Sequence, residues 1–223
     1  MTEPDPSAPL LSPAEYDLLL EEAKQVVELD VTFPEWVFKR QGGSIRFTDQ
    51  IDHGWFTLRD FAELHGDDSI SLVVLDPADH ELITGPGLRM AFTLPTSSSR
   101  DEYYRAMRFS PDTNMFSDIQ TLSARVAAFG PSKRWAYVAE RDIGAWWSDL
   151  PLADPRVREF ERRRRPWTYT ADEALGWWGL AFRGGVPNEM AKRFRENYET
   201  FDHTGDPEAG LPEWHSWDFM DDE

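Results

Sequence analysis

Apolar residues recur every three to four positions near the start of the chain. Over residues 13–28 this spacing matches the period of a helix with one buried face. Ser12 and Glu15 form a capping box at its start, in which each side chain accepts a hydrogen bond from the other residue's backbone N–H. We predict a helix here, and the residues expected on its buried face include Leu19, Ala23 and Val26.

Short runs of apolar and β-branched residues predict strands in the middle of the chain. Residues 33–48 contain two such runs around a Gly-Gly turn, and residues 69–94 contain three runs separated by turn residues. Residues 134–140 alternate well enough to form a further strand. The residues expected to be buried in these strands include Leu72, Val74 and Trp135.

Helix-start signals lie between and after these strands. Thr57 is a candidate cap for a helix that Gly66 ends, at a position that favours glycine. Capping boxes also begin at Ser99 and Ser117. After Ser117 the apolar spacing predicts one helix as far as Phe129. The residues expected on its buried face are Ile119, Leu122, Val126 and Phe129.

Helical spacing dominates the end of the chain. Three helices are predicted, over residues 155–164, 171–182 and 187–201. The residues expected to be buried are Phe194 and at least one of Trp177 and Trp178. Helices and strands do not alternate strictly, so we predict an α+β fold. In this fold an antiparallel or mixed sheet from the N-terminal two-thirds has flanking helices and a helical C-terminal part.

The same pattern divides the chain into three segments. Residues 1–11 are acidic and proline-rich and are expected to form a flexible leader. Residues 12–201 are expected to form a single α+β domain, with a candidate sub-boundary at residues 149–155. Residues 202–223 form an acidic C-terminal tail that contains aromatic residues.

Composition excludes several classes of site. The 223 residues include no cysteine, which rules out disulfides, thiolate metal sites and a cysteine nucleophile. The first residues lack the basic and apolar regions of a signal peptide, and no run of about 18 uncharged apolar residues is present. We therefore expect a cytoplasmic protein with no membrane segment.

The charge of the chain is strongly negative and uneven. The net charge of −18 divides into −12 over residues 1–132, +3 over residues 133–198 and −9 over residues 199–223. A phosphate backbone would be repelled by such a chain, so nucleic acid is disfavoured as a partner. A basic protein partner is favoured for the same reason, although solubility alone also explains an acidic surface.

Two predicted loops carry candidate catalytic residues. No phosphate-binding loop or standard catalytic motif is present, so we assign no cofactor and no metal. If the two loops meet, they offer a two-histidine–carboxylate metal site or a general base with its orienting acid. The alternative is that the aspartates only stabilise turns. The candidate residues are Asp49, Asp52 and His53 on one loop and Asp76, Asp79 and His80 on the other.

An arginine run near the end of the chain is a candidate binding feature. It consists of Arg162, Arg163, Arg164 and Arg165. These side chains are able to grip phosphate or RNA. The alternative, which the net charge favours, is a helix C-terminus whose arginines complement the helix dipole and pair with the acidic tail of the same chain.

Paired and spaced tryptophans are candidate interface anchors. Trp146 and Trp147 have the pattern of buried anchors, and on a helix one of two neighbours is more exposed than the other. The more exposed indole either anchors an interface or covers the rim of its own core. Trp214 and Trp217 are three residues apart in the tail, so one helical turn would place both on one face. We predict that residues 211–220 dock on their own domain near the arginine run, and that the docking is stronger at low salt. A docking segment for another protein is the alternative.

Three classes of function remain after these observations. The first is an acidic protein-binding module, for example an inhibitor or immunity-type protein that covers a basic partner. The composition is compatible with bacterial immunity proteins, without a motif to support that class. The second is a hydrolase or nuclease that uses the two acidic loops, and the third is a structural or assembly protein, for instance of a phage. We favour the first, because motifs typical of enzymes are absent.

Overall fold

The computed structural model describes most of the chain between residues 10 and 198. The described residues are 10–48, 54–76, 89–109, 118–140, 142–164, 168–179, 182 and 185–198. Within these ranges, the side chains of Leu122 and Trp177 are outside the description. The predictions for residues 1–9 of the leader and for the tail, residues 202–223, lie outside the described residues. Leu10 and Leu11, which the prediction placed in the flexible leader, form a short strand that pairs with residues 89 and 90.

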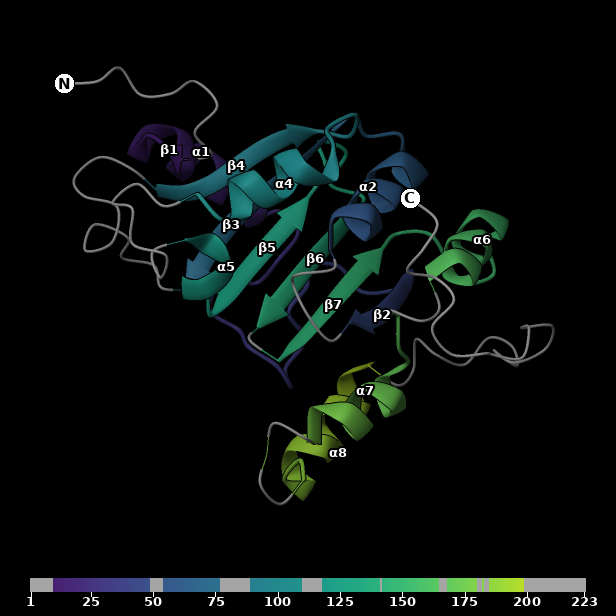
Figure 1. Ribbon diagram of the computed structural model, residues 1–223. Helices are drawn as coiled ribbons and strands as arrows, with labels where there is room; N and C mark the ends of the chain where they lie inside the picture. Colours follow the sequence, from purple (N-terminus) through teal and green to yellow (C-terminus); the bar gives the residue numbers. More distant parts are fainter. Residues whose placement is uncertain are drawn as a thin grey trace.

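Seven strands of the described chain form one sheet in the order β1-β4-β3-β5-β6-β7-β2, and every neighbouring pair is antiparallel. The sheet crosses the centre of the molecule in Figure 1. The strands are β1 (Leu10–Leu11), β2 (Ser44–Thr48), β3 (Ser69–Asp76), β4 (Arg89–Pro95), β5 (Arg125–Phe129), β6 (Trp135–Glu140) and β7 (Ile143–Ser148).

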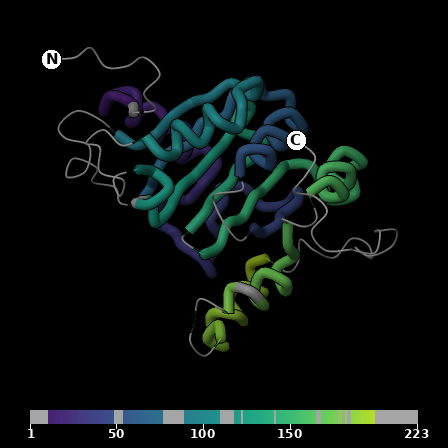
Figure 2. The backbone as a smooth tube through the Cα atoms, in the orientation of Figure 1, coloured from purple at the N-terminus to yellow at the C-terminus, as the bar shows by residue number. Residues whose placement is uncertain are grey.

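Helices cover both faces of this sheet. Residues of α1, α7 and α8 join one apolar cluster, and residues of α2, α4, α5 and α6 join the cluster on the opposite face. Figure 2 shows α7 and α8 side by side beyond one end of the sheet. The helices are α1 (Pro13–Ala23), α2 (Gly54–His65), α4 (Arg100–Met107), α5 (Ile119–Leu122), α6 (Pro155–Arg164), α7 (Ala171–Trp178) and α8 (Asn188–Tyr198).

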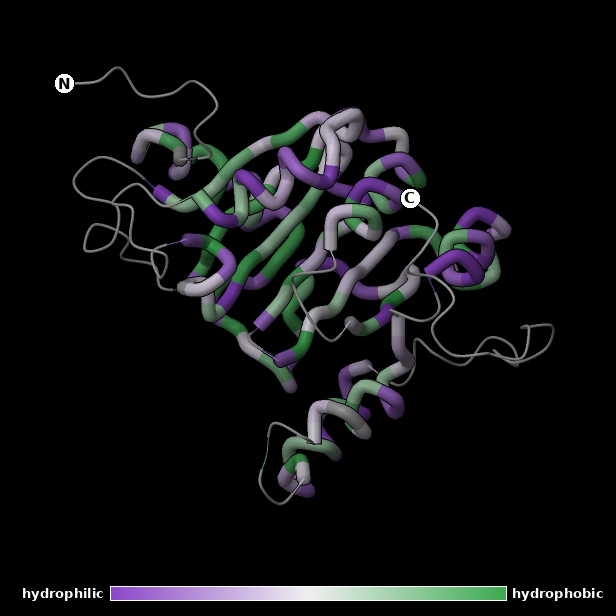
Figure 3. The backbone as a smooth tube through the Cα atoms, in the orientation of Figure 1, coloured by the Kyte–Doolittle hydropathy of each residue, from purple (hydrophilic) through white to green (hydrophobic). Residues whose placement is uncertain are grey.

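The structure confirms the α+β fold and most of the expected core. Capping boxes begin α1 at Ser12 and α4 at Ser99, and Gly66 follows α2 with a positive φ of 76°. Figure 3 shows hydrophobic positions along the central strands and hydrophilic ones along α6. The predicted core residues that are buried are Leu19, Ala23, Val26, Leu72, Val74, Ile119, Val126, Phe129, Trp135, Trp178 and Phe194.

The predicted helix from Ser117 to Phe129 is wrong over most of its length. Asp118 caps the short helix α5, which ends at Leu122, and residues 125–129 form a central strand. Every residue of this strand is buried, because helices cover both faces of the sheet. Such a strand has no alternation of polar and apolar residues, so its pattern is easily taken for a helix.

The expectation that one of Trp146 and Trp147 is exposed is also wrong. Both lie on β7, where successive side chains point to opposite faces of the sheet. Trp146 packs against Phe61 and Phe160, with ring centroids 4.1 and 5.3 Å away, while Trp147 faces Phe38 on the other side. Both indoles are therefore part of the core, with exposed fractions of 1% and 2%.

Two smaller predictions also need correction. Thr57 lies inside α2 and not at its cap, because the helix begins at Gly54. Residues 33–48 contain one named strand, β2, while Phe38 makes only an isolated bridge with Val27. The earlier part of this segment packs as a loop against the sheet face that α8 also covers.

Candidate functional site

A cavity of about 300 Å³ lies at one end of the sheet, beside α7 and α8. Its polar lining includes four charged side chains. Charged or polar side chains come from β3, β5, β6, the turn between β6 and β7, and the loop after α1. They are Thr32, Asp76, Arg125, Glu140 and Asp142.

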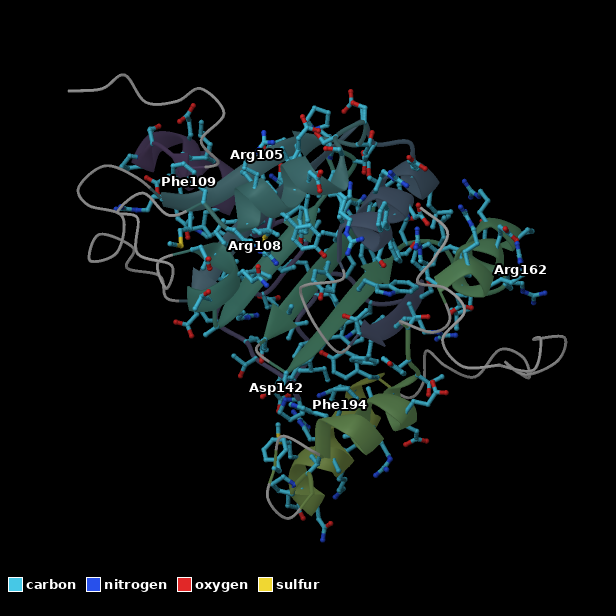
Figure 4. The ribbon with its side chains drawn as sticks, viewed as in Figure 1. Arg105, Arg108, Phe109, Asp142, Arg162 and Phe194 are labelled. Carbon is cyan, nitrogen blue, oxygen red and sulfur yellow. The ribbon has the colours of Figure 1, made fainter. Side chains whose placement is uncertain are left out.

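Strand register explains why these charges meet. Asp76 is paired with Arg125 across β3 and β5, after a register shift between Val74 and Asp76. Arg125 is in turn paired with Glu140 across β5 and β6. The three residues therefore form one row across three adjacent strands, and Asp142 follows at the next turn. Figure 4 shows Asp142 at the end of the sheet that faces α7 and α8.

Arg125 is the buried centre of this row, with only 5% of its surface exposed. Its two Nη atoms donate hydrogen bonds to the backbone carbonyls of Glu28, Leu29 and Val31. Its Nε atom lies 3.1 Å from a carboxylate oxygen of Glu140. Burial lowers the pKa of Arg125, although nearby carboxylates oppose this effect. The guanidinium thus fixes the loop after α1 to the sheet.

Glu140 is the partner of Arg125 and is itself mostly buried. Its carboxylate oxygens accept hydrogen bonds from the backbone N–H of Phe33, at 3.2 and 3.4 Å. Burial raises the pKa of the Glu140 carboxyl to about 7, against the opposing effects of Arg125 and of the Phe33 N–H. Glu140 is therefore a carboxyl that changes its charge near neutral pH, at the wall of a cavity.

The rest of the cavity wall is apolar and largely aromatic. Phe33, Ile143, Trp178, Phe182 and Met190 contribute to it. The ring centroids of Trp178 and Phe182 are 5.8 Å apart, and those of Trp178 and Phe194 are 5.5 Å apart.

Tyr198 anchors the loop that carries Phe33. Its hydroxyl donates to the carbonyl of Glu35 at 2.5 Å and accepts from the N–H of Val37 at 3.2 Å. Burial raises the pKa of the Tyr198 phenol, so it remains a neutral donor. Because Phe33 packs within 5.9 Å of this ring, the aromatic wall has a fixed position.

The charge of the cavity is negative when its groups are ionised. Three carboxylates and one guanidinium line it, and Arg125 is already bound to Glu140. Within the described residues, neither Asp76 nor Asp142 has an ion-pair partner. No group of three or more residues suited to hold a metal ion is found in those residues. The arrangement is suited to an organic cation and repels an anion.

The sequence predicted only one residue of this cavity. Asp76 was a candidate, whereas the other five acidic-loop candidates, Asp49, Asp52, His53, Asp79 and His80, lie outside the described residues. Whether the two loops meet therefore stays a prediction. Arg125, Glu140 and Asp142 were missed, because Arg125 was placed inside a helix. The sequence signal that could have found the cavity is one charged residue at an end of each of three apolar runs: Asp76, Arg125 and Glu140.

The arginine run is paired within the fold as far as it is described. Arg162 pairs with Glu159 at 2.7 Å, and Arg164 pairs with Asp60 of α2 at 2.8 Å. Arg163 lies between the same two acids, at 3.6 and 3.9 Å. These partners belong to α2 and α6 and not to the tail. Arg165, Trp214 and Trp217 lie outside the described residues.

A buried serine–histidine pair is the other arrangement that resembles a catalytic group. The Nδ1–H of His65 donates to the carbonyl of Phe61 at 2.8 Å, so Nε2 accepts from Ser148 Oγ at 2.9 Å. Burial lowers the pKa of His65. Ser148 is fully buried and also accepts from the N–H of Leu150, so no substrate reaches it. The pair joins α2 to β7 and has a structural role.

Comparisons with known proteins leave the cavity as the main guide to function. No family model matches this chain, and no curated protein and no solved structure matches it either. None of the helices in the described ranges is long and apolar enough to cross a membrane. Function is therefore argued from the geometry and charge of the described residues.

Proposed function

We propose that this chain is an acidic binding module for a basic protein partner, of the inhibitor or immunity type. The observation that supports it best is that described arginines are paired within the fold, whereas two described carboxylates at the cavity are not. The described arginines of the run are paired with acids of α2 and α6, whereas Asp76 and Asp142 at the cavity have no ion-pair partner among the described residues.

The net charge of this module determines which class of protein it attracts and how fast the two associate. A net charge of −18 attracts basic proteins that come within about one Debye length of the surface. Complementary charge raises the association rate well above that of neutral pairs, and salt reduces this advantage. A cytoplasmic location belongs to the same proposal.

The test is capture followed by a binding measurement. The chain is immobilised, proteins from an extract of its source cells are bound at low salt, and an unrelated protein of similar net charge serves as the control bait. Basic proteins retained by this chain alone are purified, and their association rates are measured over a series of salt concentrations. We expect at least one specific partner whose association rate falls steeply with salt. No specific basic partner, or a rate independent of salt, would contradict the proposal.

A second candidate function is acid–base catalysis in the same cavity. It is favoured by Glu140, whose pKa of about 7 suits proton transfer at neutral pH. If catalysis depends on a divalent metal ion, the purified protein should contain the metal, and a chelator should lower its melting temperature. Absence of both effects would remove the metal-dependent version.

A further inference from the structure

We propose that the cavity beside α7 and α8 binds the guanidinium group of one arginine side chain, presented by the basic protein partner. This inference rests on the proposed function and names the group that the site recognises. Four features of the described residues support it: the excess of carboxylates, the occupied Nη donors of Arg125, the aromatic wall and the size of the cavity.

The carboxylates provide the charge for a cationic group. Asp76 and Asp142 are exposed at the mouth of the cavity and Glu140 lies deeper. A guanidinium has five N–H donors in a planar fork, which suits carboxylates on two sides of a cavity. An anionic ligand would meet Asp76 and Asp142, which have no ion-pair partner among the described residues, so the site favours a cation.

Arg125 does not take the place of this ligand, although its guanidinium also lines the cavity. Its Nη atoms are occupied by the carbonyls of the loop after α1, and its Nε atom faces Glu140. Its charge offsets mainly that of Glu140 and acts less strongly on Asp76, so the three carboxylates of the cavity still exceed its one guanidinium. The buried ion pair also fixes the floor of the cavity before a ligand arrives.

The aromatic wall favours guanidinium over a compact ammonium group. Planar guanidinium stacks on aromatic faces and is weakly hydrated, whereas ammonium is a strongly hydrated point charge. Trp178 and Phe182 lie on one side of the cavity and Phe33 comes from the loop after α1. A volume of about 300 Å³ is at the lower end for ligand cavities, so it accommodates one side chain and not a folded segment.

The direct test uses a small arginine probe. N-acetyl-arginine methylamide is titrated into the full chain, and the indole signal of Trp178 is followed by NMR. A fragment of this size is expected to bind with a dissociation constant on the order of 1 mM. N-acetyl-citrulline methylamide has nearly the same shape without the charge, so it is the matched control and should leave the signal unchanged. Equal shifts with both probes, or no shift with either, would overturn the inference.

Two variants and a control locate the probe. Asp142→Asn and Asp76→Asn each remove one exposed carboxylate, and each is expected to weaken arginine-probe binding by about threefold to tenfold. Asp101→Asn removes another exposed carboxylate, on α4 and on the opposite face of the sheet, and should leave binding unchanged. If all three variants bind the probe like the natural chain, the cavity is not the site.

The two experiments fail in different ways. The probe titration reports on the cavity alone, and partner capture reports on the proposed function. A basic partner that binds the Asp76→Asn/Asp142→Asn double variant as well as the natural chain would overturn the inference and leave the proposed function standing. Probe binding without any basic partner would contradict the proposed function and leave a site for a free guanidinium compound.

Discussion

Glu140 shows how one buried residue links stability to pH. It lies between Arg125 and the backbone N–H of Phe33, and both of these groups favour its charged form. Removal from water favours the neutral form, and this effect is the largest. The folded protein therefore holds the Glu140 proton more tightly than the unfolded chain does. Asp76, Asp142 and the Tyr198 phenol are the other titratable groups near this carboxyl.

Glu140→Gln is expected to change the pH dependence of stability. Because the folded pKa of Glu140 is raised from 4.5 to about 7, its contribution to the free energy of unfolding is full below 4.5 and is lost as pH rises to about 7. Glutamine stays neutral, so the variant should lack this loss, and its melting temperature should fall less than that of the natural chain over the same window. Thermal melting over a pH series provides the measurement.

Glu189→Gln is the control for that comparison, because it removes an exposed carboxyl from α8. This variant should keep the natural dependence of melting temperature on pH. Identical profiles for Glu140→Gln and the natural chain would show that folding does not shift the pKa of Glu140, and the burial argument would be wrong.

At the scale of elements, the α2–α6 contact explains the arginine run. Asp60 is buried and accepts from Arg164 at 2.8 and 2.9 Å, while Arg46 of β2 pairs with Glu161 of α6 at 2.5 Å. Phe160 places the apolar side of α6 against Phe61 of α2, with ring centroids 4.3 Å apart. A run of like charges is therefore stable here because acids of neighbouring elements surround it.

Asp60→Asn is expected to weaken the contact between α2 and α6. The change removes a buried charge and leaves the Arg164 guanidinium without its partner, which should lower the free energy of unfolding by about 1–3 kcal/mol. Urea denaturation measures this difference. Glu63→Gln changes an exposed acid on the same helix, 3.8 Å from Arg59, and should have an effect of less than about 0.5 kcal/mol. Equal effects of the two variants would contradict a structural role for Asp60.

The elements differ in how much the sequence revealed of them. Helices such as α1 and α4 were predicted because local capping boxes and one exposed face determine their pattern. The strands β5 and β7 were missed because both of their faces are buried, which removes the alternation that identifies a strand. The cavity depends on the register of β3, β5 and β6, and pairing between distant segments leaves little trace in a local pattern.

At the scale of the whole molecule, the apolar core and most of the described charged side chains occupy different places in the fold. One sheet is buried between two apolar clusters, and the acids that are buried among the described residues are Asp60, Asp67 and Asp118. Most of the acids that give the chain its net charge of −18 therefore lie outside the described core. Many described surface ion pairs join exposed side chains and contribute little to stability. The excess of acid is therefore free to serve association, as the proposed function requires.

Removal of residues 211–223 is expected to lower the melting temperature of the whole chain. Docking of Trp214 and Trp217 would bury about 300–500 Å² of indole surface. This area favours docking by several kcal/mol at about 25 cal/mol per Å², against the entropy of ordering a short segment. For a chain of 223 residues, each kcal/mol of lost stability lowers the melting temperature by about 2–4 °C.

The structure changes the expected salt dependence of that effect. Arg162 and Arg164 already pair with Glu159 and Asp60, so the nine acids after residue 198 find few free arginines among the described part of the run. Apolar burial must then provide most of the docking energy, and the effect of the deletion should be nearly the same at low and high salt. Trp214→Ala combined with Trp217→Ala should reproduce the deletion, whereas neutralising the four acids after Trp217 should not. Unchanged melting of the double tryptophan variant would mean that the tail does not dock on its own domain, and would leave it available to a partner.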